Sequence, residues 1–384
     1  MMAHPAVHMD QSQQVSFKEG VLSTQGMKAL IETGGIQSTT AITEKQLQPA
    51  SLDLRLGSVA YRVQAGFLPS NATVEEYLSG LKMHEIDLSN GGVLEKGAVY
   101  IVPLQESLNL DENMSGVASP KSSTGRLDIF TRLLTDFGSL GFDKVKSGYE
   151  GGLYLEVSPM TFSIIAHTGD CLNQLRLRVG NTTFSDTDLR LLDEAEPLVY
   201  LADSNNEKAN ISNGLWMSVD LEGKDGSGII AYRAKHHAPL IDLQNIGHYI
   251  VSDFWEPIYK NPSNRLILNP EDFYIMASRE HLRVPAEYSA EMMPYETTAG
   301  ELRVHYAGFF DPGFGCTDDG SQQGTTGVLE IRSHDVPFVL EHGQRICRMV
   351  YERLTEVPDK IYSRGIGSNY AAQGLKLAKQ FKQD

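Results

Sequence analysis

Apolar residues in this chain gather in short runs that alternate with polar residues or carry β-branched side chains, and Gly, Pro and Asp separate the runs. Such spacing predicts β-strands joined by turns. A helical spacing occurs after Ser23 at 24–33, after Ser185, and at 373–381. The chain is therefore predicted to be mainly β, with few short helices and with strands that form a barrel or jelly roll. The clearest strand runs are 98–104, 152–158, 172–179, 273–278, 327–333 and 345–354.

This pattern occurs twice in the same order. Ser-Leu-Asp-Leu at 51–54 returns as Ser-Val-Asp-Leu at 218–221, and Leu-Glu-Val at 155–157 returns as Leu-Glu-Ile at 329–331. The copies lie roughly 170 residues apart, a regularity that predicts an internal repeat. A short helix capped by Ser185 and a polar, turn-rich linker separate them. We predict two tandem modules, the first at 1–205 and the second at 206–384.

Composition narrows the choice of partners. Of the 384 residues 41% are hydrophobic, and 33 basic residues against 49 acidic ones give a net charge of −16. Nucleic acid and anionic membranes both need a basic surface, so neither is expected as a partner. The N-terminus lacks the apolar stretch of a signal peptide, and no apolar run is long enough to span a bilayer, which predicts a cytoplasmic protein. The widely spaced Cys171, Cys316 and Cys347 predict neither disulfides nor a zinc site.

The sequence lacks the signatures of zinc deaminases, zinc proteases, serine hydrolases and P-loop enzymes. A hydrolase built on this chain must activate water without such a metal site. The sharpest polar cluster is Lys-Ser-Ser-Thr-Gly-Arg at 121–126, whose cations and hydroxyls suit an oligophosphate. The alternative is a solvated turn, because short Lys-Ser runs are common in loops.

Three further features place polar groups where chemistry is possible. The turn from Asp311 to Phe314 offers a carboxylate for a sugar hydroxyl and a ring for a pocket wall, although a plain turn has the same sequence. Glu156 and Glu330 each lie inside an apolar strand, where alternation points them toward solvent. Near apolar walls they would instead have the raised pKa of a general base. The tail from Tyr362 suits either an arm that closes over a polar ligand or a frayed basic tail.

Taken in order, these pieces resemble the dCTP deaminases, of the long duplicated type, within the dCTP deaminase and dUTPase superfamily. The family's motifs are an opening Pro-x-Ser-x-Asp-Leu-Arg-Leu-Gly, an Arg-Ser-Ser-x-x-Arg, an Asp-Pro-Gly-aromatic turn followed by Leu-Glu, and a C-terminal arm with Tyr, Tyr and Gln. Lys121 replaces the first Arg of the second motif, and Asn369 replaces a Lys of the arm. The motifs correspond to 49–57, 121–126, 311–314 with 329–330, and Tyr362, Tyr370 and Gln373.

The resemblance implies dUTPase-like modules and the hydrolysis of dCTP to dUTP and ammonia, which supplies dUTP for dTTP synthesis. It implies chemistry without zinc, with Mg²⁺ bound through the triphosphate and a glutamate that activates the water attacking C4 of cytosine. One-module members of the family are trimers with sites between subunits. A homo-oligomer with sites between modules is therefore expected here.

The two copies keep different parts of the motif set. The first has Lys-Ser-Gly-Tyr at 146–149 instead of the Asp turn, and the second has Glu-Thr-Thr-Ala-Gly-Glu at 296–301 instead of the phosphate motif. Like charges ~4 Å apart repel by about 4 kcal/mol even at an effective dielectric constant of ~20, so two carboxylates there would repel a triphosphate.

We therefore predict one composite site, within or between chains, and a complementary pairing around Glu156 that is inactive. From the resemblance, Glu330 is the general acid/base, with Glu156 as the alternative base, and Ser122 and Arg126 act beside it. The substrate-binding residues are expected to be Lys121, Ser123, Ala307, Asp311, Phe314, Tyr362, Tyr370, Gln373 and Lys376.

Two other functions fit the same motifs. One is a dUTPase, or a bifunctional enzyme that carries dCTP to dUMP, because both share the fold and the phosphate motif. The other is a nucleotide-binding relic without catalysis, because each copy has lost part of the site.

Overall fold

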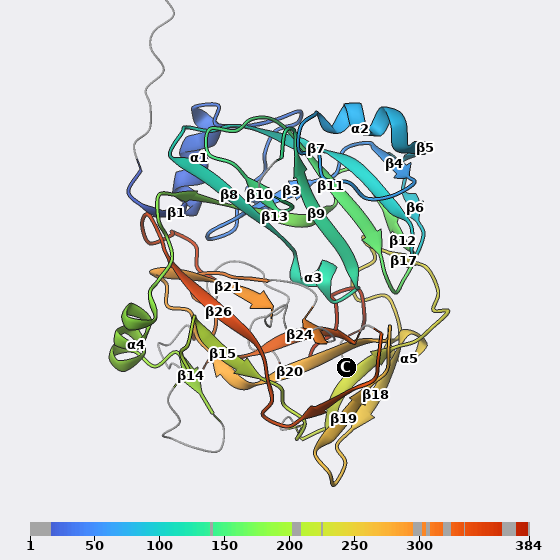
Figure 1. Cartoon of the computed structure of the whole chain (residues 1–384), viewed down its shortest axis with the longest axis vertical. Coiled ribbons are helices and arrows are strands. Elements are labelled where there is room, and N and C mark those ends of the chain that lie inside the picture. The colour runs from blue at the N-terminus through green and yellow to red at the C-terminus, as the bar shows by residue number, and fades with distance from the viewer. Residues whose placement is uncertain are drawn as a thin grey trace, which may run out of the picture.

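A computed structural model describes residues 17–138, 141–201, 209–223, 226–294, 302–304, 308–317, 324–333, 335–362 and 374–382 of the chain. These residues form mainly strands with few short helices, which confirms the predicted fold class. All six strand runs predicted from the sequence are strands. We call residues 17–181 the first half of the chain and residues 182–382 the second half. The first half occupies the upper part of Figure 1, and most of the second half lies in the lower part.

The first half is built on two antiparallel sheets and shares a third. One sheet runs β1 (Gly20–Val21), β13 (Cys171–Val179), β8 (Met114–Pro120), β10 (Lys144–Val145), with β3 (Leu52–Arg55) also on β13. The next runs β5 (Lys82–Asp87), β4 (Val59–Val63), β7 (Val99–Asn109), β11 (Glu150–Pro159), β9 (Ile129–Thr135), with β2 (Ile36–Ser38) on β7. The third contains β6 (Gly92–Leu94), β12 (Ile164–Ala166) and, from the second half, β17 (Ile241–Asp242).

The second half repeats the order of strand pairing. Its larger sheet runs β18 (Trp255–Tyr259), β16 (Ile229–Ala234), β20 (Phe273–Leu282), β24 (Thr325–Ser333), β22 (Leu302–Val304), with β14 (Val199–Tyr200) on β20. A second sheet runs β15 (Leu215–Ser218), β26 (Arg345–Arg353), β21 (Tyr288–Pro294), β23 (Phe309–Phe310). The last pairs β19 (Arg265–Leu268) with β25 (Phe338–Glu341). Common ancestry of the two halves stays a prediction.

Two of the three predicted helices are present. Ser23 caps α1 (Thr24–Glu32), because its hydroxyl accepts a hydrogen bond from the Gly26 N–H. Ser185 caps α4 (Asp186–Ala195) in the same way. The chain also forms α2 (Val74–Leu81), α3 (Ser122–Gly125) and α5 (Val251–Phe254). Of these, α2 carries a signal that we missed, a capping box between Thr73 and Glu76.

The helix predicted at 373–381 is wrong. Residues 374–382, the described part of that stretch, contain turns and extended chain but no helix. Carbonyls of this segment instead accept hydrogen bonds from other segments, including Lys376 O, which a helix would use internally. Lys376 O accepts from Arg126, Lys379 O accepts from the N–H of Gly247, and Gln380 O accepts from that of His248.

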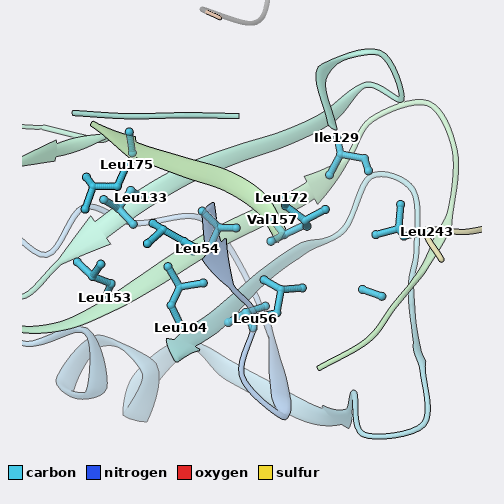
Figure 2. Close-up of a cluster of buried hydrophobic side chains, with 14 of the residues drawn as sticks. Leu54, Leu56, Leu104, Ile129, Leu133, Leu153, Val157, Leu172, Leu175 and Leu243 are labelled. Atoms are coloured by element: carbon cyan, nitrogen blue, oxygen red, sulfur yellow. The ribbon is translucent and has the colours of Figure 1, made fainter. Parts of the chain in front are cut away.

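Buried apolar side chains form one main core in each half. Figure 2 shows part of the first core, with Leu133, Leu153 and Val157 on the neighbouring strands β9 and β11, Leu175 on β13 of the other sheet, and Leu243 from the second half. Trp255, Phe273 and Phe381 join the same core, so it continues across the contact between the halves.

The boundary between the modules stays a prediction. Residues 202–208, where we placed it, lie outside the described residues. Leu189 of α4, which we assigned to the first module, packs in the second core. In Figure 1, α3 lies at the junction, above the strands of the second half.

Candidate active site

A pocket lies between the two halves of the chain, at the junction where α3 meets the second half. The first half contributes the loop before α3 and the helix itself, including Lys121, Ser122 and Arg126. The second half contributes Glu330 on β24 together with a mainly aromatic wall. Residues of the phosphate motif at 121–126 and Glu330 of the second half therefore line one pocket within a single chain, as a composite site requires. The remaining lining residues are Pro120, Gly125, Met292, Gly308, Phe309, Phe310, Phe314, Val328 and Tyr362.

The polar cluster at 121–126 folds as one helical turn with its flanks, rather than as an open loop. Ser122 is exposed at its start and faces the pocket, whereas Lys121 pairs with the buried carboxylate of Asp53. Ser123 is buried and lines a second cavity on the other side of the turn, with Lys379. The structure therefore brings Lys121, Ser122 and Arg126 to the pocket and separates Ser123 from it.

Glu330 is buried on β24, opposite Ile275 of the neighbouring strand β20. Alternation left open an orientation toward solvent, but only 5% of the residue is exposed. Burial raises the pKa of Glu330 to about 7, while Arg126 opposes this rise. A carboxylate with that pKa exchanges protons near neutral pH, as a general acid or base must.

Asp311 begins the predicted turn and lies beside an arginine of the first half. The turn closes with the Phe314 N–H donating to Asp311 O at 3.0 Å, and Gly313 supplies the left-handed backbone it needs, with φ of 90°. Burial raises the pKa of Asp311 to about 6, and Arg176 Nη2, 3.6 Å from Oδ1, opposes this. Among the described residues, nothing donates a hydrogen bond to Oδ1. A buried acceptor in this condition fits a hydroxyl donor from a ligand.

The tail reaches the pocket, although part of it lies outside the described residues. Tyr362 lines the pocket with its ring 5.4 Å from that of Phe314, and its N–H donates to Pro312 O. The carbonyl of Lys376 accepts a hydrogen bond from Arg126 Nη1 at 3.0 Å. Ala307, Tyr370, Gln373 and the 296–301 segment lie outside the described residues.

Glu156, the counterpart of Glu330, has a different environment. Its carboxylate accepts a hydrogen bond from Arg132 Nε at 2.9 Å, and the Arg132 guanidinium stacks 3.7 Å over the Phe142 ring. The backbone of Gly66 approaches so closely that a Cβ there would lie 2.5 Å from Oε2. The space around this carboxylate is thus filled by the first half's own side chains.

Arg176 is a site residue that sequence reasoning missed. It is fully buried on β13, and its guanidinium lies 4.0 Å over the Phe309 ring and binds Glu352 at 3.3 Å. The only signal is the alternation Leu-Arg-Leu-Arg at 175–178, which places arginines between core leucines. That pattern is typical of a strand with one solvent face, and only the second half turns that face into an interface.

One group of possible metal ligands occurs among the described residues, away from the pocket lining. Asp220, Glu222 and His342 place their ligand atoms within 4.8 Å of one another. However, His342 Nδ1 already accepts a hydrogen bond from the Leu221 N–H at 3.1 Å. We therefore interpret these three residues as a structural cluster and not as a metal site.

Comparison with known proteins identifies the family. The family model for the "2'-deoxycytidine 5'-triphosphate deaminase (DCD) N-terminal domain" matches residues 18–181, and that for the C-terminal domain matches residues 185–381. The chain belongs to the dCTP deaminase family. This confirms the resemblance and makes the chain an enzyme that acts on a C–N bond.

Individual dCTP deaminases agree with this assignment. A solved structure, 2'-deoxycytidine 5'-triphosphate deaminase from Agrobacterium tumefaciens, is 48% identical, with a TM-score of 0.83 over 89% of this chain and 99% of that one. A "dCTP deaminase, dUMP-forming" from Methanosphaera stadtmanae is 26% identical over 143 residues, 36% of this chain and 68% of the relative. One of the same name from Halobacterium salinarum is 29% identical over 124 residues, 32% and 59% of the two chains.

No helix within the described ranges is long and apolar enough to cross a membrane.

Proposed function

We propose that the pocket between the two halves binds dCTP and hydrolyses it to dUTP and ammonia. The observation that carries this proposal is that the phosphate motif kept by the first copy and the Glu330 strand kept by the second line the same pocket. Cations and a hydroxyl from 121–126 line it together with Glu330, whose pKa lies near neutrality. The family assignment supports the same reaction.

Substrate binding follows from the charges around the pocket. Lys121 and Arg126 neutralise the triphosphate, which brings its own Mg²⁺, and the Ser122 hydroxyl donates to an oxygen of the phosphates or to the reacting water. Asp311 Oδ1 accepts a hydrogen bond from the deoxyribose hydroxyl, and the ring of Phe314 walls the pocket. Contacts of the base edge with Ala307, and of the phosphates with Tyr370 and Gln373, stay predictions.

In the chemical step Glu330 acts first as a base and then as an acid. It takes one proton from the water that attacks C4 of cytosine and delivers it to N3. The second proton of that water passes to the amino group, the C4–N bond breaks, and ammonia leaves as C4 becomes a carbonyl. Arg126 stabilises the ionised form of Glu330 and the charge that develops beside it.

The donor set supports a reaction without zinc. The described residues that line the pocket include one carboxylate and neither His nor Cys. A catalytic zinc usually takes three protein ligands of those types. Assembly into a homo-oligomer stays a prediction, and the pocket lining described above comes from a single chain.

Product analysis tests the proposed function. Purified protein with dCTP and Mg²⁺ is expected to release ammonia and dUTP in equal amounts, which ion-exchange chromatography and an ammonia assay would measure. The names of the relatives from Methanosphaera stadtmanae and Halobacterium salinarum favour a second candidate, in which the same protein continues to dUMP. Pyrophosphate and dUMP in amounts equal to the ammonia would establish that candidate. Binding of dCTP without ammonia release would contradict both.

The rate of deamination is expected to depend on pH through Glu330. Because the base must be ionised and burial raises its pKa to about 7, kcat/KM should fall about tenfold per pH unit below pH 7 and level off above it. Initial rates between pH 5 and pH 9, in excess Mg²⁺ to suppress titration of the triphosphate, would show this. A flat profile from pH 5.5 to pH 8 would contradict the role of Glu330.

A further inference from the structure

A buried ion pair joins the two halves directly beside the pocket. Asp128 of the first half is fully buried, and Arg332 of the second half is 9% exposed. Arg332 Nε donates to Asp128 Oδ2 at 3.1 Å, and Nη2 pairs with the same oxygen. Thr161 completes the group, because its hydroxyl donates to Oδ2 of Asp128 at 2.5 Å and accepts from Arg332 Nη2 at 2.8 Å.

Each residue of this ion pair lies two positions after a charged residue of the pocket. Asp128 comes two residues after Arg126, and Arg332 comes two residues after Glu330. On a strand, side chains two apart project from the same face, so Glu330 and Arg332 both point from β24 toward the first half. At the contact between the halves, Asp128 of the first half and Arg332 of the second form an ion pair, and Arg126 of the first half and Glu330 of the second line one pocket and interact through their charges.

The backbone connects Asp128 rigidly to α3. Its N–H donates to Gly125 O, and its carbonyl accepts from the Met160 N–H, both at 2.9 Å. Asp128 has a φ of 55°, a left-handed conformation that is uncommon outside Gly and that the surrounding contacts must hold in place. A displacement of this residue moves the end of the turn that carries Arg126.

The corresponding position in the first half lacks the arginine of this pair. The repeat offset of 174 residues, which aligns Glu330 with Glu156, aligns Arg332 with Ser158 of β11. The Ser158 hydroxyl donates to Ala98 O within its own half, and a serine cannot replace the Arg332 guanidinium. The ion pair thus belongs to the side of the interface that keeps both parts of the site.

We propose that Asp128 and Arg332 are positioning residues, which hold Glu330 opposite Arg126 by fixing α3 against β24. The inference rests on the proposed function, because Glu330 must meet the water bound beside Ser122 and Arg126. Neither residue touches the substrate in this scheme. Loss of the pair therefore changes turnover more than substrate binding, since a misplacement of 1 Å can cost about a hundredfold in rate.

The test compares steady-state kinetics of dCTP deamination for wild type, Asp128→Asn, Arg332→Gln and the double variant. Each single variant is expected to lower kcat at least tenfold with KM changed less than threefold, by loss of preorganisation. The double variant should be no worse than the worse single one, because the partners act as a unit. Arg332→Lys should restore part of kcat, and Asp128→Gly, which relaxes the backbone but removes the carboxylate, should not.

Glu291→Gln provides the matched control. It breaks another ion pair between the halves, from Arg178 at 2.8 Å, and is expected to lower the urea midpoint without lowering kcat. If the pair variants lose stability as this control does but keep wild-type kcat, the positioning role is overturned while the proposed function stands. A wild-type protein that releases no ammonia from dCTP overturns the proposed function and this inference with it.

Discussion

Glu330→Gln is expected to lower kcat for ammonia release from dCTP by about 10²–10⁴-fold, the range over which general acid–base catalysis contributes. The amide has nearly the same volume, so the apolar neighbours of β24 keep their packing, but it cannot take a proton from water. Binding of dCTP should survive, because the phosphate and sugar contacts come from other residues. Single-turnover kinetics together with equilibrium binding of dCTP would separate the two effects.

Glu156→Gln is the control that the repeat itself supplies. The same change at the corresponding strand position leaves an oxygen that still accepts a hydrogen bond from Arg132, so kcat should remain at the wild-type value. Comparable losses in both variants would contradict the assignment, and so would a loss in Glu156→Gln alone. The pair of variants thus tests whether this chain has one working pocket or two.

The elements of the fold were largely predictable, because they depend on local patterns. Alternating runs predicted the long strands, and Ser23 and Ser185 marked the starts of α1 and α4. The failure at 373–381 has a physical cause. Its Leu, Ala and Phe side chains have a helical spacing, but they are buried against the other segments of both halves while its carbonyls accept hydrogen bonds from those segments. Tertiary contacts thereby override a local preference.

The site was predictable only where the two copies could be compared. Their unequal motifs indicated which half keeps the phosphate residues and which keeps Glu330. The burial of Glu330 was beyond local reasoning, because alternation describes one strand and not the module packed over it. Arg176 and the pair of Asp128 with Arg332 were missed for the same reason. Each looks like an ordinary surface charge until the halves are in contact.

Arg176→Met is expected to lower the free energy of unfolding by about 3–5 kcal/mol, because it leaves buried carboxylates without their cation. Arg176 is fully buried and binds Glu352 at 3.3 Å, Asp311 at 3.6 Å and the carbonyl of Ala290 at 3.0 Å, all from the second half. Met fills much of the volume but supplies no charge. Urea unfolding followed by fluorescence would measure the loss, and Arg265→Met is the control.

Arg265 forms an ion pair with Glu341 at 2.7 Å, but both side chains are more than half exposed, so its loss should cost at most about 1 kcal/mol. Equal losses in the two variants would contradict the importance we give to burial. Arg176→Met should also weaken dCTP binding at neutral pH. Arg176 opposes the rise in the pKa of Asp311, so without it a larger fraction of Asp311 is protonated and accepts the sugar hydroxyl less well. Weaker binding in Arg176→Met that recovers as the pH is raised would link the stability of the interface to the sugar end of the pocket.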